Sequence, residues 1–362
     1  MLPELPEEIL LHIIDILLNE ATRSVIPLLL VNSRFRDLCL SILHTNLRFS
    51  SLKQMTSFVD NRIRLINRPK TLSILLAGGA VDPQYRLFCI LYDIIARIRD
   101  SGLDTPREIK FCLNSHTFDH NIIHLYYALS LVNPEVFMWT GPDPAHHFST
   151  AIVSRASYCL TMAMYNWTNL RHLKLTNISL SSDVDVCHGS EDSQSRQSGH
   201  FIADALLRSK CSGERIQIID SYKKLEPLTY PQSTEIEVLT SLTRLSSIYL
   251  GQVTFLDPLE ITRIACAEAQ LPSLTSIRIV DAYRGSIWGP RVRKSDVERA
   301  VMTLFSSNEE DSHEADGSSI TDHREYLELS REYLKGLDRV RTLVYCEALT
   351  ERIMGGDRMD ES

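Results

Sequence analysis

Three histidines recur at every fourth position in the segment His116-Thr-Phe-Asp-His-Asn-Ile-Ile-His124. On a single helix these positions would share one face, and imidazole nitrogens beside the Asp119 carboxylate are ligands that zinc accepts. His116, however, follows directly on Asn114-Ser115, a pair typical of a loop, and this places it before any helix. We therefore expect a solvated face or a helix cap here, and no metal site.

Other segments contain residue types that could support catalysis or ligand binding, but they lack the further residues that such a site requires. Gly78-Gly79 follows an apolar run but has neither the third glycine nor the Lys-Ser/Thr of a phosphate-binding loop, and His146-His147 follows a Gly-Pro-Asp-Pro turn. The chain contains 8 cysteines, none in a CxxC pair, and most sit within apolar runs, as expected of buried reduced thiols. We expect no catalytic residue and no cofactor. The competing enzyme hypothesis, a metal- or thiol-dependent hydrolase, requires a pocket that gathers several histidines.

Bulk composition limits the classes of partner. The chain has 362 residues, of which 44% are hydrophobic and 23% charged, and its formal net charge is −8. An acidic chain gives no reason to expect nucleic acid as the main partner. No stretch combines transmembrane length with an absence of charge, so we expect no membrane partner.

The elements that must position any site begin with an unusually apolar segment, LPEEILLHIIDILL, at residues 5–18. On a helix its apolar arc spans roughly 220°, about twice the arc that a one-sided surface helix needs. Flanking glutamates and the absence of a basic leader argue against a secretory signal. Two further helical patterns follow, the second beginning near Pro27 and the third capped by Asn32 or Ser33, so residues 1 to about 45 are predicted to form three short helices.

After this region, apolar runs of strand length alternate with helical patterns, which predicts an α/β fold. The predicted strands are 72–76, 108–113, 135–139, 170–175, 215–220, 245–250, 274–280 and 340–345. The predicted helices cover 85–99, 121–132, 151–164, 200–209, 258–269, 295–305 and 324–334.

Four of these strands share the pattern LxxLxL, which is typical of leucine-rich repeats. The four segments are Leu170–Leu175, Leu245–Leu250, Leu274–Ile279 and Val340–Tyr345. One strand and one helix cannot bury their own apolar faces, but stacked units can, so the pattern favours an irregular α/β solenoid with parallel strands. The alternative is an ordinary α/β fold with a parallel sheet, because LxxLxL also describes any buried strand.

Two polar segments are predicted to be disordered loop insertions. Residues 181–199 are rich in serine and poor in aromatics, and residues 306–322 hold six acidic residues with no Lys or Arg. Neither can bury enough apolar surface to offset the entropy of ordering.

The first 49 residues resemble an F-box. The opening Leu-Pro followed by Glu-Ile-Leu, and the closing Leu-x-x-Val-x-x-x-Phe-Arg-x-Leu, follow the order of that family's pattern, with Phe35 where many members carry Trp. The matching positions that the resemblance assigns to adaptor binding are Leu5, Pro6, Glu8, Ile9, Leu10, Ile13, Leu17, Leu28, Val31, Phe35 and Leu38. Residues 50–362 resemble, more loosely, the leucine-rich-repeat-like substrate regions of fungal, especially basidiomycete, F-box proteins.

The resemblance implies a non-catalytic receptor subunit of a Skp–cullin–F-box (SCF-type) ubiquitin ligase, located in the cytoplasm or nucleus. The three helices would dock on a Skp-type adaptor and through it on a cullin-RING ligase, while the repeat domain would hold a target protein near the ubiquitin-conjugating enzyme. The alternative is a non-degradative repeat scaffold that binds the adaptor or other proteins without directing ubiquitination. Candidate target contacts are Trp288, Arg291 and Arg293, in a loop rich in basic residues.

Overall fold

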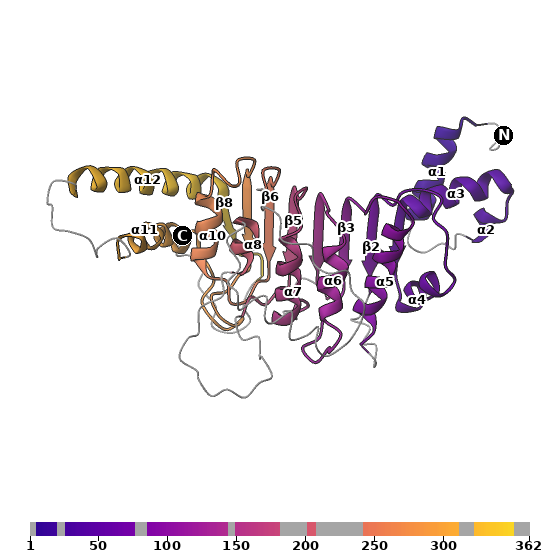
Figure 1. Cartoon of the computed structure of the whole chain (residues 1–362), viewed down its shortest axis with the longest axis horizontal. Coiled ribbons are helices and arrows are strands. Elements are labelled where there is room, and N and C mark those ends of the chain that lie inside the picture. The colour runs from indigo at the N-terminus through magenta and orange to yellow at the C-terminus, as the bar shows by residue number, and fades with distance from the viewer. Residues whose placement is uncertain are drawn as a thin grey trace.

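A computed structural model describes residues 5–19, 26–76, 85–143, 149–181, 201–207, 242–310 and 322–350 of the chain. These residues form one sheet of eight parallel strands that follow one another in chain order, with helices packed beside them (Figure 1). The predicted α/β class with parallel strands is therefore confirmed.

The strands are short, and each pairs only with its neighbours in the chain order. They are β1 (Asn46–Phe49), β2 (Thr71–Leu75), β3 (Glu108–Cys112), β4 (Val136–Thr140), β5 (His172–Thr176), β6 (Ser247–Gly251), β7 (Ser276–Val280) and β8 (Val344–Glu347). Segment 215–220, which was predicted to be a strand, lies outside the described residues, as does the loop at 182–199.

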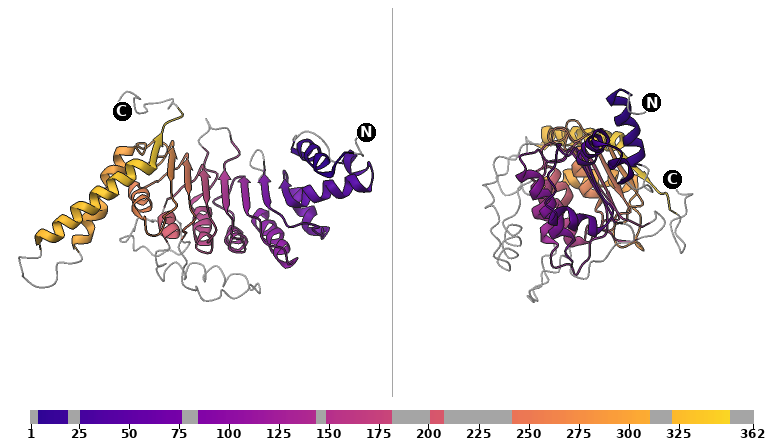
Figure 2. Two further views of the ribbon diagram at one scale, coloured as in Figure 1. Left: turned by 90° about the horizontal axis from the view of Figure 1, so that it is seen from above. Right: turned by 90° about the vertical axis from the view of Figure 1, so that its right-hand side faces the viewer.

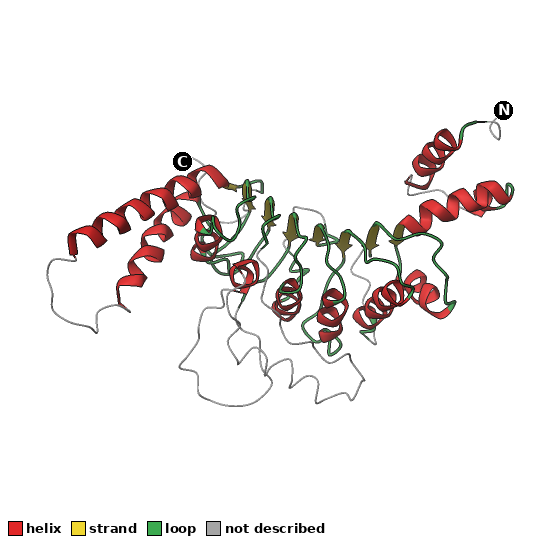
Figure 3. Cartoon of the chain, turned by 45° about the horizontal axis from the view of Figure 1, so that its top comes forward, coloured by secondary structure: helices red, strands yellow, loops and turns green. Residues whose placement is uncertain are grey.

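The helices cover one face of this sheet, and no helix among the described residues covers the opposite face (Figures 2 and 3). In chain order after the N-terminal three, the helices are α4 (Leu52–Asp60), α5 (Leu87–Asp100), α6 (Ile123–Ser130), α7 (Ser154–Met164), α8 (Phe201–Leu207), α10 (Pro258–Cys266), α11 (Lys294–Glu310) and α12 (Asp322–Leu343). Helix α11 extends through residues 306–310, which were predicted to belong to a disordered loop, and 311–321 lie outside the described residues.

Alternation along each strand explains how the sheet packs. In β5, Leu173 and Leu175 are buried against the helices, whereas Lys174 between them points to the helix-free side. The leading leucine of the pattern, Leu170, is also buried, as are the equivalent Leu245 and Leu274. These three repeats contribute to one continuous core, which includes residues of all eight strands.

The same motif occurs in three earlier strands with proline in its first position. These prolines are Pro69, Pro106 and Pro134. Each is buried and lies two residues before its strand, which is β2, β3 or β4, respectively. Each is followed at +3 and +5 by two buried apolar residues, for example Phe137 and Trp139 after Pro134. A proline there is compatible with the entry to a parallel strand, because it needs no donor in the ladder.

The predicted register of the fourth LxxLxL strand is wrong by one residue. Helix α12 continues to Leu343, so Val340 and Leu343 are buried residues of a helix, and β8 begins at Val344. Val344 pairs with Ile277 and points inward, while Tyr345 is 49% exposed on the other face. A shift of one residue exchanges the two faces of a strand, and here the uninterrupted apolar run permits either register.

Three helices precede the sheet, as predicted: α1 (Glu7–Asn19), α2 (Ile26–Leu29) and α3 (Ser33–Thr45). The Asn32 side chain caps α3 by accepting a hydrogen bond from the Phe35 amide at 2.9 Å. These helices share a small core of their own, separate from that of the sheet, and only α3 leads into β1. Residues 46–49, at the end of the predicted first domain, belong to the sheet as β1. Among the described residues, no helix is long and apolar enough to cross a membrane.

Candidate functional site

The N-terminal helices lie at one end of the molecule (Figure 1), and they expose large apolar side chains. Ile9 and Ile16 lie two turns apart on α1 and are each 48% exposed, while Leu30 and Val31, just after α2, are 77% and 56% exposed. We call these four residues the N-terminal apolar positions. Helix α1 contacts α3 on one side, which leaves the wide apolar arc predicted from its sequence partly uncovered. Exposed apolar residues that gather on one small unit mark an interaction site or an aggregation hazard.

The residues that the resemblance assigned to adaptor binding fall into three groups. Pro6, Glu8, Ile9 and Val31 are exposed, and Leu5, Ile13, Leu17 and Leu28 are half-buried. The remaining three lie in the core that the helices share and present little or no surface to a partner: Leu10, Phe35 and Leu38. Ile16 and Leu30 are exposed apolar positions that the motif did not include, although helical spacing from Ile9 indicates Ile16.

The three candidate target contacts differ in how exposed their side chains are. Trp288 is 75% exposed in the loop between β7 and α11, and Arg293 is exposed near the start of α11. Arg291, by contrast, has a side chain that is only 12% exposed, and its guanidinium lies 3.4 Å from the Asp281 carboxylate. Arg291 therefore has a partner inside the fold, which sequence reasoning missed because Asp281 lies on the far side of the loop.

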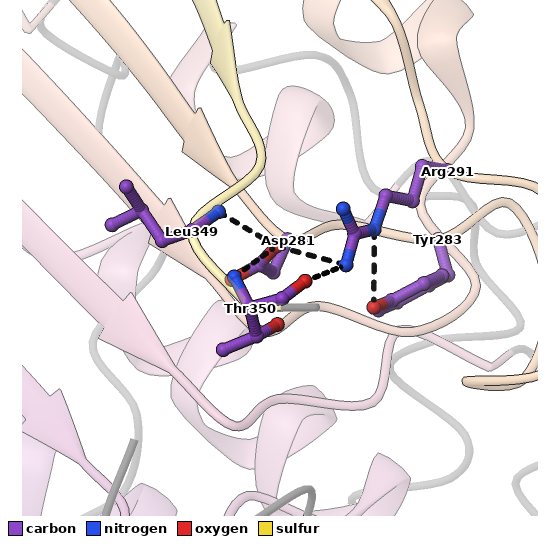
Figure 4. A network of polar contacts seen from close by, with 5 residues as sticks. All are labelled: Asp281, Tyr283, Arg291, Leu349 and Thr350. Carbon is purple, nitrogen blue, oxygen red and sulfur yellow. Dashed lines mark hydrogen bonds and ion pairs between the residues drawn. The ribbon is translucent and has the colours of Figure 1, made fainter. Parts of the chain in front are cut away.

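Asp281 organises a buried network at the ends of β7 and β8 (Figure 4). Its backbone has a φ of +50°, a conformation that Asp and Asn adopt more readily than other side chains. Its carboxylate accepts hydrogen bonds from the amides of Leu349 and Thr350 at 3.1 and 3.2 Å. Arg291 in turn donates to the Thr350 carbonyl and, at 3.4 Å, to the Tyr283 hydroxyl. The network ties the loop that carries Trp288 to the chain beyond β8.

The helix-free face of the sheet carries charged and aromatic side chains in register. We call this surface the open face; it consists of the strand residues that alternate with the buried ones. Its central row, one residue from each strand in order, is Arg48, Ser73, Lys110, Met138, Lys174, Tyr249, Arg278 and Tyr345. Four of these eight residues are cationic, on a chain whose net charge is −8.

The three spaced histidines do not form a metal centre. His116 and His120 lie in the turns before α6 and contact the Tyr85 ring, with centroids 6.2 and 5.9 Å apart. His124 lies within α6 and is buried beside Tyr92. No group of His, Cys, Asp or Glu among the described residues is arranged to hold a metal ion. His146-His147 and Gly78-Gly79 lie outside the described residues.

None of the described cysteines forms a disulfide, and burial makes several of their thiols poor nucleophiles. Burial raises the pKa of Cys159 to about 12 and the pKa values of Cys266 and Cys346 to about 11. The thiolate is the nucleophile, so such groups are inert near neutral pH.

A polar cavity of about 380 Å³ opens at the edge of the sheet where the strands begin. Its lining consists of Arg68, Asp104, Thr105, Arg107, Asn133, Glu135, Asn169 and Arg244. Arg68 pairs with Asp104 at 2.5 Å and Arg107 with Glu135 at 3.6 Å, so the cavity neutralises most of its own charge. It contains no histidine or cysteine, unlike the pocket that the hydrolase hypothesis requires.

Comparison with known proteins adds no assignment: no protein-family profile matches the chain, and no curated protein matches it.

Proposed function

We propose that this chain is a receptor subunit of an SCF-type ubiquitin ligase, in which helices α1–α3 act as an F-box and the sheet with its helices acts as a leucine-rich-repeat-like solenoid. The single observation that carries the proposal is the N-terminal unit. It has its own core around Leu10 and Ile14, and it leaves Ile9, Ile16, Leu30 and Val31 in solvent.

A Skp-type adaptor would cover the N-terminal apolar positions. Burying an isoleucine side chain contributes about 1.5–3 kcal/mol, so the four exposed apolar side chains would form the apolar centre of a larger contact. The buried residues Leu10, Phe35 and Leu38 would then act indirectly, by holding α1 and α3 in place. A cullin and a RING subunit would join through the adaptor.

The body of the chain would select a target protein and hold it near the ubiquitin-conjugating enzyme. This role needs no catalytic residue, since it acts by raising the effective concentration of target lysines. The arrangement of inert thiols and separated histidines among the described residues is compatible with such a role.

Co-expression with a Skp-type adaptor, followed by affinity purification and size-exclusion chromatography, tests the proposal. We expect a stable one-to-one complex that Ile9→Asp weakens by about a hundredfold, because the variant loses apolar burial and places a carboxylate in an apolar contact. The matched control is Met302→Asp, which alters a side chain that is 57% exposed on α11 at the opposite end of the molecule.

A folded chain that ignores the adaptor would contradict the proposal. So would equal weakening by Ile9→Asp and Met302→Asp, because this result would point to loss of solubility. Co-purification of a cullin with the complex distinguishes a ligase receptor from a scaffold that binds only the adaptor.

A further inference from the structure

The open face of the sheet calls for a physical explanation. Sheets with only parallel strands are ordinarily covered on both faces, and their strands are then apolar throughout. Here the strands alternate, and among the described residues only one face is covered by helices (Figure 3). The open face thus presents side chains that the core does not need.

Tyr249 lies at the centre of the C-terminal half of this face. The Lys174 ammonium, on the preceding strand, lies 5.0 Å from the centroid of the Tyr249 ring, and the Arg278 guanidinium, on the following strand, lies 5.7 Å from it. A Cβ on Gly251 would lie 2.9 Å from Cε1 of Tyr249, so the ring leans over this glycine. Two cations thus flank one aromatic ring in a fixed arrangement.

The two cations differ in their charge balance. Arg278 donates to both oxygens of Glu347, at 2.7 and 2.6 Å, and is therefore neutralised. Lys110, further along the row, pairs with Glu108 at 2.8 Å. Lys174 has no carboxylate within ion-pair distance among the described residues. The central cation of the open face is consequently held in place by an aromatic ring while its charge is not balanced by an acid.

Apolar surface lies beside this charge. Met138 neighbours Lys174 across the row, and Val136 is on the same strand and the same face; both are half-buried. A ligand that suits this surface carries a carboxylate for Lys174 and an apolar side chain for Met138. Nucleic acid fits less well, because a row of phosphates needs several unpaired cations, whereas Lys110 and Arg278 are already paired with Glu108 and Glu347.

We propose that the open face, centred on Lys174, Tyr249 and Arg278, binds an acidic segment of a partner protein in extended conformation, with apolar residues next to the acids. The inference rests on the proposed function and names the chemical class of its target. From β4 to β8 the face spans four strand intervals of about 4.8 Å each, or roughly 19 Å. An extended peptide crosses this distance in about six residues at about 3.3 Å per residue.

An array of synthetic peptides whose Glu, Lys, Ser and Leu contents vary independently, probed with the labelled full chain, tests the inference. We expect binding to rise with Glu content when Leu is present and to weaken as salt is added. Lys174→Glu replaces an attraction by a repulsion and should weaken binding of the acidic peptides about fivefold. Lys53→Glu, which makes the same charge change at an exposed position on α4, should leave binding within about twofold.

Further variants keep the test independent of folding. Lys174→Gln should weaken binding less than Lys174→Glu, and Tyr249→Leu should weaken it by freeing the Lys174 side chain; circular dichroism verifies that each variant is folded. Binding that does not depend on Glu content, or that Lys53→Glu weakens as much as Lys174→Glu, would overturn the inference.

The same variants separate this inference from the proposed function. Lys174→Glu should keep adaptor binding, and Ile9→Asp should keep binding of acidic peptides. A wild-type chain that binds the adaptor but no acidic peptide refutes only the assignment of the open face. A chain that binds acidic peptides but no adaptor refutes only the ligase role.

Discussion

The Asp281 network yields the sharpest prediction about stability. Asp281→Ala removes the carboxylate that faces Arg291 and leaves the Leu349 and Thr350 amides without their acceptor. Breaking a buried ion pair from one side costs about 3–5 kcal/mol. We expect about 3 kcal/mol, the low end of that range, because Arg291 is 12% exposed and keeps its bonds to Thr350 and Tyr283.

Asp281→Asn should cost about half as much. An asparagine keeps an oxygen acceptor for the two amides and tolerates the φ of +50° at this position, so it loses only the charge. Asp104→Ala is the matched control, because Asp104 is 70% exposed and its ion pair with Arg68 should contribute under about 1 kcal/mol.

Native-state hydrogen exchange is the suitable assay, since each strand contacts only its neighbours and the end of the sheet can open without the rest. A loss of 3 kcal/mol corresponds to about a hundredfold faster exchange of the β8 amides. Exchange in β3 should not change. An Asn variant as stable as the wild type would refute the role of the charge, and equal losses in the Ala and Asn variants would refute the role of the acceptor. Faster exchange across all strands would refute the local opening.

Two further predictions concern the cores. Leu10→Ala empties a fully buried site and should lower the free energy of unfolding of α1–α3 by about 2–5 kcal/mol. We expect faster hydrogen exchange in α1 and no change in the thermal transition of the sheet. A lowered transition of the sheet would show that the two cores unfold together. Burial, followed by the nearby charges of Asp257 and Asp204, raises the pKa of Glu260 to about 8. The unfolded chain releases this proton near pH 4.5, so the wild type loses stability as the pH rises from about 4.5 to 8. Glu260→Gln should remove that loss, with a gain in urea unfolding that grows from zero near pH 4.5 to at most about 5 kcal/mol at pH 8; a gain independent of pH would contradict the assignment.

Alternation of apolar residues made most of the strands predictable. Where polar residues separate buried ones, as Lys174 separates Leu173 from Leu175, the sequence determines both the strand and its faces. The prediction failed where the run is apolar without interruption, because Leu343–Cys346 suits a helix end and a strand equally well. Strand β1 was missed because Asn46–Phe49 continues the apolar pattern of α3.

The candidate sites were less predictable, because surface exposure depends on what packs against an element. Ile9 and Leu10 are adjacent and chemically similar, yet one is 48% exposed and the other fully buried, and only the position of α3 decides between them. Arg291 belongs to a basic run that resembles a surface patch, but its partner is ten residues earlier, across a turn. The open face could have been read from the residues between the buried ones once the shared register was known.

The register also bears on how such a chain can change in length. Arg171 and Ser246 are 75 residues apart, and Ser246 and Thr275 are 29 apart, yet each pair makes the same contact, a backbone bond of 2.8 or 2.9 Å at the start of adjacent strands. Lengthening a closed loop from 29 to 75 residues raises the entropic free-energy cost of closing it by only about 0.8 kcal/mol. Insertions between units should therefore be nearly neutral for the sheet, whereas a single residue added within a strand would turn its core outward. Divergence in length should accumulate at the junctions, where a domain or tag can also be grafted.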